Sequence, residues 1–197
     1  MEFIAHRINT AAELRDLPSE YGVELDLRDS GDSLILQHDP FSTGEDFEDY
    51  LKCYKHGTII LNIKSERIEH KVKVLLDKYS IKKYFFLDSS FPMIHLLSKN
   101  GERNSALRFS EFEGLDTIYN MQGKCSWVWV DCFTQLPITK KIEQNIRAAG
   151  YKLCLVSPEL QGRESDILNY KKYLNDSNIM FDAICTKKHN IEIWDTK

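Results

Sequence analysis

Residues 23–28 read VELDLR, an apolar run in which two carboxylates stand two positions apart. Side chains two positions apart in a β-strand point to the same face, so Glu24 and Asp26 would face one spot. A hard divalent cation requires such a set of converging oxygen ligands. His6 precedes this segment and His38 follows it. The segment therefore predicts a buried strand that carries part of a functional site.

Seven further short apolar runs accompany this one, and longer amphipathic stretches separate them. The eight runs cover residues 3–6, 23–28, 59–63, 84–87, 106–109, 127–132, 153–156 and 183–185. Eight alternating β and α units predict an α/β fold, a closed parallel (β/α)8 TIM barrel. The chain has 197 residues where about 250 are typical, so we expect a compact barrel with trimmed loops and stunted helices. An open doubly wound sheet is the alternative, although no glycine-rich phosphate loop follows the first strand.

A small hairpin insertion is predicted after the second strand, because the apolar residues 34–37 follow the turn residues 30–32. Residues 10–13 have the Thr-x-x-Glu form of a helix capping box. Gly101 and Gly150 stand where the C-terminal caps of helices belong. Apolar side chains at helical spacing predict helices in residues 45–55, 65–78, 91–98, 139–149 and 164–174.

The composition is that of an ordinary soluble protein, with 42% apolar and 28% charged residues, and the length favours one domain over residues 1–197. A net charge of -4 without a basic tail argues against a nucleic-acid partner and against attraction to an anionic membrane. No apolar run approaches the roughly 20 residues that span a bilayer, and no signal peptide is visible. Five scattered cysteines predict reduced thiols, so we expect a cytoplasmic protein without a stable membrane anchor.

In a (β/α)8 barrel the functional site lies at the C-terminal ends of the strands. Polar residues at those ends of the predicted strands are His6, Arg7, Glu24, Asp26, Asn62, Lys64, Asp88, Arg108, Asp131, Ser157, Glu159, Thr186 and Lys187. Metal ligands, phosphate-binding cations and proton-transfer groups are all present in this set. Together with His38, they are typical of phosphodiester cleavage by a general acid and a general base.

Four motifs stand in order along the first third of the chain. They are His6-Arg7, Glu24-Leu25-Asp26, His38-Asp39 and Asn62-Ile63-Lys64. This ordered set resembles the glycerophosphodiester phosphodiesterase family, within the phosphatidylinositol-phospholipase-C-like barrels. The family pattern is a first strand ending in His-Arg, a second with Glu-x-Asp, a hairpin insertion ending in His-Asp, and a third strand ending in Glu-x-Lys.

The rest of the chain resembles a short branch of that family, often encountered among bacterial surface-polysaccharide functions. The segments that carry this resemblance are residues 85–92, 108–113, 127–131 and 156–160. Two positions depart from the family pattern. Ile8 stands where the family usually has glycine, and Asn62 stands where the third metal ligand is a glutamate. An asparagine oxygen can ligate Mg²⁺ or Ca²⁺, but one negative charge is lost, so we expect a lower metal affinity.

The resemblance implies a metal-dependent phosphodiester hydrolase associated with lipid metabolism. Its partner would be a small-molecule phosphodiester, free or linked to a glycan. One divalent cation, Mg²⁺, Ca²⁺ or Mn²⁺, would be held by Glu24, Asp26 and Asn62. His6 would act as general base and His38 as general acid. The phosphate and the rest of the substrate would be bound by Arg7, Lys64, Arg108, Asp131 and Glu159.

Other interpretations stay open from the sequence alone. The barrel could be catalytically weak or inactive, and could bind a phosphorylated sugar or polymer end through Arg7, Lys64 and a weakly held cation. Glu24 and Asp26 could form a solvated strand face paired with Arg28. A phosphosugar isomerase or aldolase is disfavoured, because the segment after the seventh strand offers no backbone nest for a phosphate.

Overall fold

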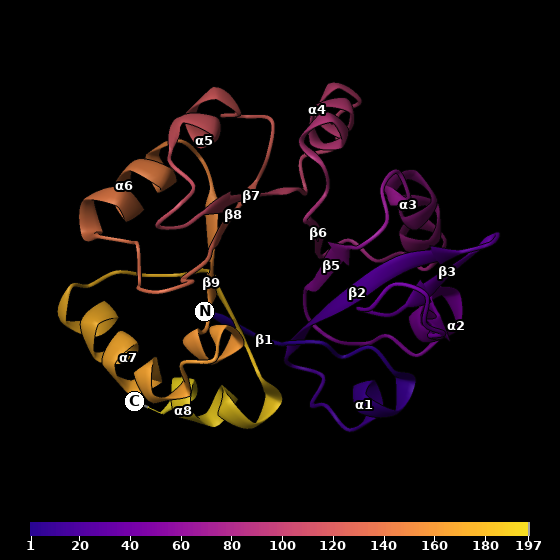
Figure 1. The fold of residues 1–197 in the computed structure, drawn as a ribbon, viewed down its shortest axis with the longest axis horizontal. Coiled ribbons are helices and arrows are strands. Elements are labelled where there is room, and N and C mark those ends of the chain that lie inside the picture. The colour runs from indigo at the N-terminus through magenta and orange to yellow at the C-terminus, as the bar shows by residue number, and fades with distance from the viewer. Residues whose placement is uncertain (197) are drawn as a thin grey trace.

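A curled sheet of parallel strands forms the centre of the computed structural model, which describes residues 1–196 (Figure 1). The parallel strands are β1 (Glu2–Ala5), β2 (Gly22–Ser30), β5 (Ile59–Ile63), β6 (Tyr84–Leu87), β7 (Ala106–Phe109), β8 (Trp127–Val130), β9 (Lys152–Val156) and β10 (Ala183–Thr186). All eight predicted apolar runs form strands. The prediction of an α/β fold built on a parallel sheet is confirmed.

Two series of parallel ladders start from β1. One runs from β1 to β2, β5 and β6, and the other runs from β1 to β10, β9, β8 and β7. A single isolated bridge between Phe86 and Ser105 joins the far ends of the two series. We call this place, between β6 and β7, the seam. The sheet is therefore curled, with continuous ladders everywhere except at the seam.

The end of β2 extends beyond its parallel neighbours and carries an antiparallel ladder. Residues 27–30 of β2 pair with β3 (Ser33–Leu36), and Gly31 in the intervening turn has a φ of 57°. Glycine adopts this left-handed conformation without strain. β3 pairs in turn with the short strand β4 (Glu45–Asp46). The helix predicted from residue 45 is therefore wrong at its start, because this pairing delays the helix to Phe47.

Helices lie around the periphery of the curled sheet in Figure 1, with the strands toward the centre. They are α1 (Ala11–Arg15), α2 (Phe47–Lys52), α3 (Glu69–Lys78), α4 (Phe91–Lys99), α5 (Asp116–Asn120), α6 (Lys140–Ala148), α7 (Ile167–Asp176) and α8 (Ile191–Asp195). Short 3-10 turns cover Pro158–Gln161, Glu164–Asp166 and Lys188–Asn190. The predicted capping box is present at the start of α1, where Thr10 and Glu13 bond each other reciprocally. Several helices are stunted, as expected, and α1, α5 and α8 have only five residues each.

Strand side chains alternate between two apolar layers. The layer inside the curl includes Ile4, Ile60, Phe85, Trp127, Trp129, Cys154 and Cys185. The layer that packs with the helices includes Leu25, Leu27, Leu61 and Ile63. Alternation along β2 and β5 therefore sets Glu24, Asp26 and Asn62 on the inner face of the sheet.

Two further properties of the described chain bear on its biology. Within residues 1–196, no helix combines the length and the apolar character that crossing a bilayer demands. All five cysteines carry free thiols, and Cys53 is exposed while the other four are buried.

Candidate functional site

The inner faces of β2 and β5 bring Asp26 and Asn62 side by side. The two residues are register partners in the parallel ladder, and both are buried. Asn9 donates to Oδ2 of Asp26 at 2.9 Å, and Nδ2 of Asn62 donates to Oε1 of Glu24 at 2.8 Å. The Oδ1 atoms of Asp26 and Asn62 are buried and have no hydrogen-bond partner among residues 1–196. Within the described chain, neither oxygen accepts a hydrogen bond, and only Nζ of Lys64, 3.5 Å from Oδ1 of Asp26, lies within ion-pair distance.

The second carboxylate oxygen of Glu24 faces the end of β1. It accepts a hydrogen bond from the backbone N–H of Arg7 at 2.8 Å and lies 3.6 Å from Nε2 of His6. Arg7 has a φ of 55°, so the chain turns sharply as β1 ends. Its side chain reaches Asp26, with Nε 3.8 Å from Oδ2. The first two sequence motifs therefore form one cluster.

Burial shifts the pKa values of the two titratable groups that face each other here. Burial, followed by the positive charge of Arg7, lowers the pKa of His6 to about 4. His6 is therefore neutral near pH 7 and can accept a proton. Burial, followed by the negative charge of Asp26, raises the pKa of Glu24 to about 7. A positive charge between the two carboxylates would relieve their repulsion.

A row of alternating charges continues from Asp26 along the ends of β5 to β8. Nζ of Lys64 lies 3.5 Å from Oδ1 of Asp26 and 3.8 Å from Oδ2 of Asp88. Arg108 donates to Oδ1 of Asp88 at 2.8 Å and to Oδ2 of Asp131 at 2.6 Å. The predicted site residues on these four strands therefore belong to one network of charged groups.

His38 lies on the loop after β3, outside that network. Its Nδ1 is 2.8 Å from Oδ1 of the exposed Asp39. Arg28 donates to the backbone carbonyl of His38 from Nε at 3.1 Å and from Nη2 at 2.7 Å. Nη1 of Arg28 donates to the backbone carbonyl of Lys64 at 3.0 Å. Arg28 thus ties the His38 loop to the strand end that carries Lys64.

Glu159 is buried, and its carboxylate is already in use. One oxygen accepts from the hydroxyl of Thr186 and, at 3.0 Å, from the backbone N–H of Lys187. The other accepts from the hydroxyl of Ser157. These bonds join the ends of β9 and β10, so Glu159 stands at the edge of the site as a fixed anion.

Three contacts of the site were not predicted from the sequence. Asn9 holds Asp26 from two sides, because it also accepts from the backbone N–H of Asp26 at 2.8 Å. Gln161 donates to Oδ1 of Asp131 at 2.8 Å. The third is the set of hydrogen bonds from Arg28 to the backbone carbonyls of His38 and Lys64. The sequence suggests Arg28 only as a partner of Glu24 and Asp26 on a solvated strand face. A polar residue in the loop shortly after the first strand is a weak signal for Asn9, and the other two contacts have no local signal.

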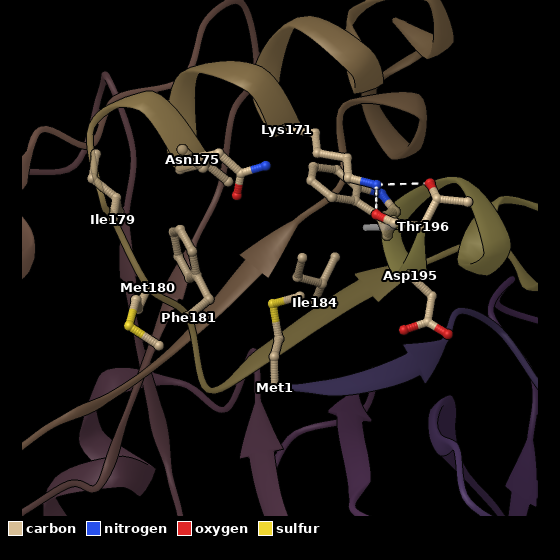
Figure 2. A pocket seen from close by; sticks show the side chains of 11 residues that line it. Met1, Lys171, Asn175, Ile179, Met180, Phe181, Ile184, Asp195 and Thr196 are labelled. Carbon is tan, nitrogen blue, oxygen red and sulfur yellow. Dashed lines mark hydrogen bonds between the residues drawn. The ribbon is translucent and has the colours of Figure 1, made fainter.

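A separate cavity lies near the start of β1 and β10, away from the candidate site. Figure 2 shows this space of about 300 Å³ between α7, α8 and the segment before β10. Its lining is mainly apolar and includes Leu174, Phe181 and Ile184, while Lys171 donates to Oγ1 of Thr196 at 2.8 Å beside it. None of the candidate site residues borders it. The cavity is therefore separate from the candidate site.

Comparison with known proteins identifies the architecture. No family model matches the sequence, and no curated protein is significantly similar to it. The crystal structure of glycerophosphodiester phosphodiesterase from Agrobacterium tumefaciens str. C58 is similar, with a TM-score of 0.67 and 18% identity over 94% of this chain and 96% of that one. This chain has the fold of the glycerophosphodiester phosphodiesterases.

Two further solved structures support the same assignment of the fold. A glycerophosphoryl diester phosphodiesterase from A. tumefaciens str. C58 has a TM-score of 0.68 at 14% identity, over 98% of this chain and 96% of that chain. One from Parabacteroides distasonis ATCC 8503 has a TM-score of 0.65 at 11% identity, over 98% of this chain and 85% of that chain. The resemblance inferred from four short motifs is thus confirmed at the level of the fold.

The donor set on β2 and β5 fits one divalent cation. Asp26 and Asn62 each offer a buried oxygen that accepts no hydrogen bond in residues 1–196, and Glu24 adds a buried carboxylate on the same face. Within residues 1–196, no group of three or more His, Cys, Asp or Glu side chains is arranged to hold a metal ion. A cation would therefore depend on the amide oxygen of Asn62, which both Mg²⁺ and Ca²⁺ accept as a ligand.

Proposed function

We propose that this protein is a metal-dependent hydrolase of small or glycan-linked phosphodiesters. The observation that carries the proposal is the 3.6 Å separation of His6 from the Glu24 carboxylate, beside the buried Oδ1 atoms of Asp26 and Asn62, which accept no hydrogen bond from the described residues. The cluster stands at the C-terminal ends of parallel strands, where barrel enzymes carry out their reactions. The similar solved structures, which are glycerophosphodiester phosphodiesterases by name, support the same reaction class.

Glu24, Asp26 and Asn62 would hold one divalent cation, which we propose to be Mg²⁺, Ca²⁺ or Mn²⁺. When bound, the cation supplies positive charge next to a phosphate oxygen on which negative charge grows in the transition state. Arg7 and Lys64 would hold the phosphate from other sides, Arg7 through its planar fork and Lys64 as a point charge. Both side chains already approach Asp26, at 3.8 Å and 3.5 Å.

His6 and His38 would move the protons of the reaction. His6, neutral because its pKa is about 4, would take a proton from the attacking water or from a neighbouring substrate hydroxyl. His38, held by Asp39, would give a proton to the leaving alcohol. In the net reaction one P–O bond forms to water and one breaks, so that a phosphate monoester and an alcohol result.

Arg108, Asp131 and Glu159 would contact the substrate beyond its phosphate. Arg108 is already paired with Asp88 and Asp131, which leaves it little capacity for a second anion. We therefore propose that substrate hydroxyl groups bridge these charged pairs. Glu159, fixed by Thr186 and Ser157, would act mainly through its negative charge near the site.

We also propose that the eight parallel strands close into a (β/α)8 barrel, with β3 and β4 as a hairpin insertion. The bridge between Phe86 and Ser105 supports closure across the seam, and the antiparallel ladder of β2 and β3 supports the insertion. The backbone N–H of Phe86 donates to the carbonyl of Asn104 at 2.8 Å. Slow hydrogen exchange of this amide is expected for a closed ring, and fast exchange would indicate an open one.

A second candidate function is binding without turnover, and Asn62 is the observation that favours it. An amide at this position leaves the cation with one negative ligand fewer than a glutamate would give. The protein would then bind a phosphorylated sugar or polymer end through Arg7 and Lys64. Such binding would raise the melting temperature without releasing product.

Hydrolysis assays that start from metal-free protein test the proposal. The substrates are bis(p-nitrophenyl) phosphate and glycerophosphodiesters, with Mg²⁺, Mn²⁺ or Ca²⁺ added back beside a His6→Ala control. We expect metal-dependent turnover that falls by about 10²- to 10⁴-fold in the control, while the melting temperature is kept. No turnover with any metal, but melting shifts with phosphosugars, would support the binding role instead.

A further inference from the structure

A cavity of about 240 Å³ opens at the seam, next to the candidate site. Its walls come from the segment after β6, from β7, and from the start of α5. Ala106 and Leu107 both line it, although they are neighbours whose side chains lie on opposite faces of the sheet. The cavity therefore reaches between the strand ends, which is possible because only one bridge joins β6 to β7.

Ser89 gives this cavity a polar group without a partner. The residue is 8% exposed, and its Oγ is buried with no hydrogen bond to any described residue. Buried hydroxyls in folded proteins are nearly always paired, so the unpaired Oγ of Ser89, a residue that borders the cavity, is available to a ligand or a water that reaches it. Asp88, just before it, has a φ of 59°, a left-handed conformation that aspartate adopts more readily than most residues.

The charges around the cavity select a neutral ligand. Asp88, Glu113 and Arg108 line it, and Arg108 is already paired with Asp88 at 2.7 Å and with Asp131 at 2.6 Å. A second phosphate would thus meet two carboxylates and no free cation. Neutral hydroxyl groups suit this lining, because they donate to carboxylates and accept from a guanidinium or a serine at the same time.

The volume and lining of the cavity suit a single ring. Its volume of about 240 Å³ is below the roughly 300–1,000 Å³ of pockets for drug-sized ligands, so a long acyl chain would not fit. Phe91 is 52% exposed and lines the same space, which adds a flat apolar surface beside the polar groups. A sugar ring combines hydroxyl groups at its edge with an apolar C–H face, and so matches both kinds of lining.

Asp88 lies between the cavity and the place proposed for the phosphate. Asp88 borders the cavity and lies 3.8 Å from Nζ of Lys64, which in turn lies 3.5 Å from Oδ1 of Asp26. A group in the cavity could therefore be covalently attached to a phosphate held by Lys64.

We propose that this cavity, the seam subsite, binds one neutral sugar ring in the alcohol part of the phosphodiester. This inference rests on the proposed function and names its substrate class. Asp88 and Arg108 exchange hydrogen bonds with the ring hydroxyls, and the hydroxyl of Ser89 gains the partner that it lacks. Phe91 packs against the C–H face of the ring.

Gly114 allows the subsite to be blocked without strain. It lines the cavity, and a Cβ added to it meets no atom within 4 Å. Gly114→Leu adds an isobutyl group at the lining of the cavity, and Gly114→Ala is the matched control that adds one methyl group. Ser89→Ala removes the unpartnered hydroxyl by a change that is small enough to keep the fold.

The variants are assayed with phosphodiesters of methanol joined to a hexose, to glycerol or to octanol, and with methyl p-nitrophenyl phosphate. For the hexose diester we expect KM to rise by at least about tenfold in Gly114→Leu and by about 3- to 10-fold in Ser89→Ala, the effect of one neutral hydrogen bond. Gly114→Ala should behave like the wild type, and methyl p-nitrophenyl phosphate should be cleaved equally by all. A KM for the hexose diester that neither variant changes, or a larger effect on the octyl diester, would overturn the proposal.

Saturation-transfer NMR with free methyl hexosides separates this inference from the proposed function. Transfer to a hexoside in the wild type that Gly114→Leu abolishes, with no turnover of any diester, would retain the subsite and remove the hydrolase. Turnover of diesters without hexoside binding and without the KM effects would retain the hydrolase and remove the subsite. Absence of both turnover and hexoside binding would remove both.

Discussion

Asn62 lies directly opposite Asp26 in the ladder of β2 and β5, and the Oδ1 atoms of both residues are buried without a hydrogen-bond partner in residues 1–196. A buried polar atom without a hydrogen bond costs about 1–3 kcal/mol. Nζ of Lys64, at 3.5 Å, offsets this cost for Asp26, so Asn62 carries most of it in the metal-free fold. One bound cation would complete both oxygens at once. A cation bound to these two oxygens would therefore raise the free energy of unfolding.

Asn62→Glu should strengthen cation binding and weaken the metal-free fold. We expect about tenfold tighter Mg²⁺ binding, since affinity rises with the charge of the ligand set. The melting temperature in chelator should fall, because the new carboxylate would face Glu24, which now accepts from the amide at 2.8 Å. Calorimetric titration and melting curves with and without Mg²⁺ measure the two effects. Asn62→Ala should lose the Mg²⁺-dependent rise in melting temperature, and an unchanged rise would put the cation elsewhere.

The two histidines should differ in their dependence on the leaving group. A general acid matters when the leaving alcohol is a poor leaving group, and p-nitrophenolate needs little protonation. His38→Ala should therefore lose about 10²- to 10⁴-fold in kcat on glycerophosphodiesters and much less on bis(p-nitrophenyl) phosphate. His6→Ala should lose activity on both substrates. Equal losses by the two variants on both substrates would contradict the assignment of the acid and the base.

Arg28 should act through His38. Its three hydrogen bonds fix the backbone of His38 and of Lys64, and a lysine could make only part of this set. Arg28→Lys should lower kcat on glycerophosphodiesters by about tenfold, the effect of a small misplacement of a catalytic group, with the same leaving-group dependence as His38→Ala. Arg15→Lys, on the exposed end of α1, serves as the control. A uniform loss on every substrate would indicate a purely structural role for Arg28.

Stability at acid pH should depend on Glu143. Burial would raise its pKa, but hydrogen bonds from Lys140 and Arg147, both at 2.7 Å, outweigh burial and lower the pKa in the folded state. The stabilisation is therefore complete above the unfolded pKa of about 4.3 and is lost as the pH falls through the lower folded value. Denaturant unfolding of wild type and Glu143→Gln should differ by about 1–3 kcal/mol at pH 7. A difference that persists at pH 2 would rule out this ion-pair origin.

Thiol labelling should distinguish Cys53 from the other cysteines. Cys53 is exposed and the other four are buried. Burial raises the pKa of Cys125 to about 11 and that of Cys132 to about 12, so these groups form little reactive thiolate. A colorimetric thiol reagent should find one group in the native protein and all five in denaturant. Native Cys53→Ser should give no rapid reaction, and rapid reaction of that variant would show that a buried thiol is accessible.

The strands were predictable because their signal is local. Each apolar run lies inside a parallel sheet covered on both faces, so it reads as a short continuous apolar segment between amphipathic stretches. Helix boundaries were less predictable. Glu45 carries a helix-like pattern with the residues after it, yet it pairs with Leu36 in a ladder that only the folded chain brings together. The last helix, α8, has five residues, too few to give a helical period.

Part of the candidate site could also be predicted, for a topological reason. All strands of a parallel sheet end at the same edge. Glu24, Asp26 and Asn62 could therefore be grouped at that edge without knowing the register of the strands. The partners of those groups could not be predicted. Arg108 binds carboxylates that lie 20 and 23 positions away in the chain. Those pairings depend on side-chain reach across strands, which no spacing in the sequence encodes.

The pairing of β1 with β10 sets the order in which this chain can fold as it is made. Domains form from the N-terminus during synthesis, and β1, β2 and β5 can assemble as soon as residue 63 has left the ribosome. One edge of β1 then stays open until Ala183–Thr186 emerge, because only that segment pairs with Glu2–Ala5 on this side. An open strand edge is a template for pairing with other chains. Nascent chains of this protein are therefore exposed to aggregation through the free edge of β1 until β10 has emerged.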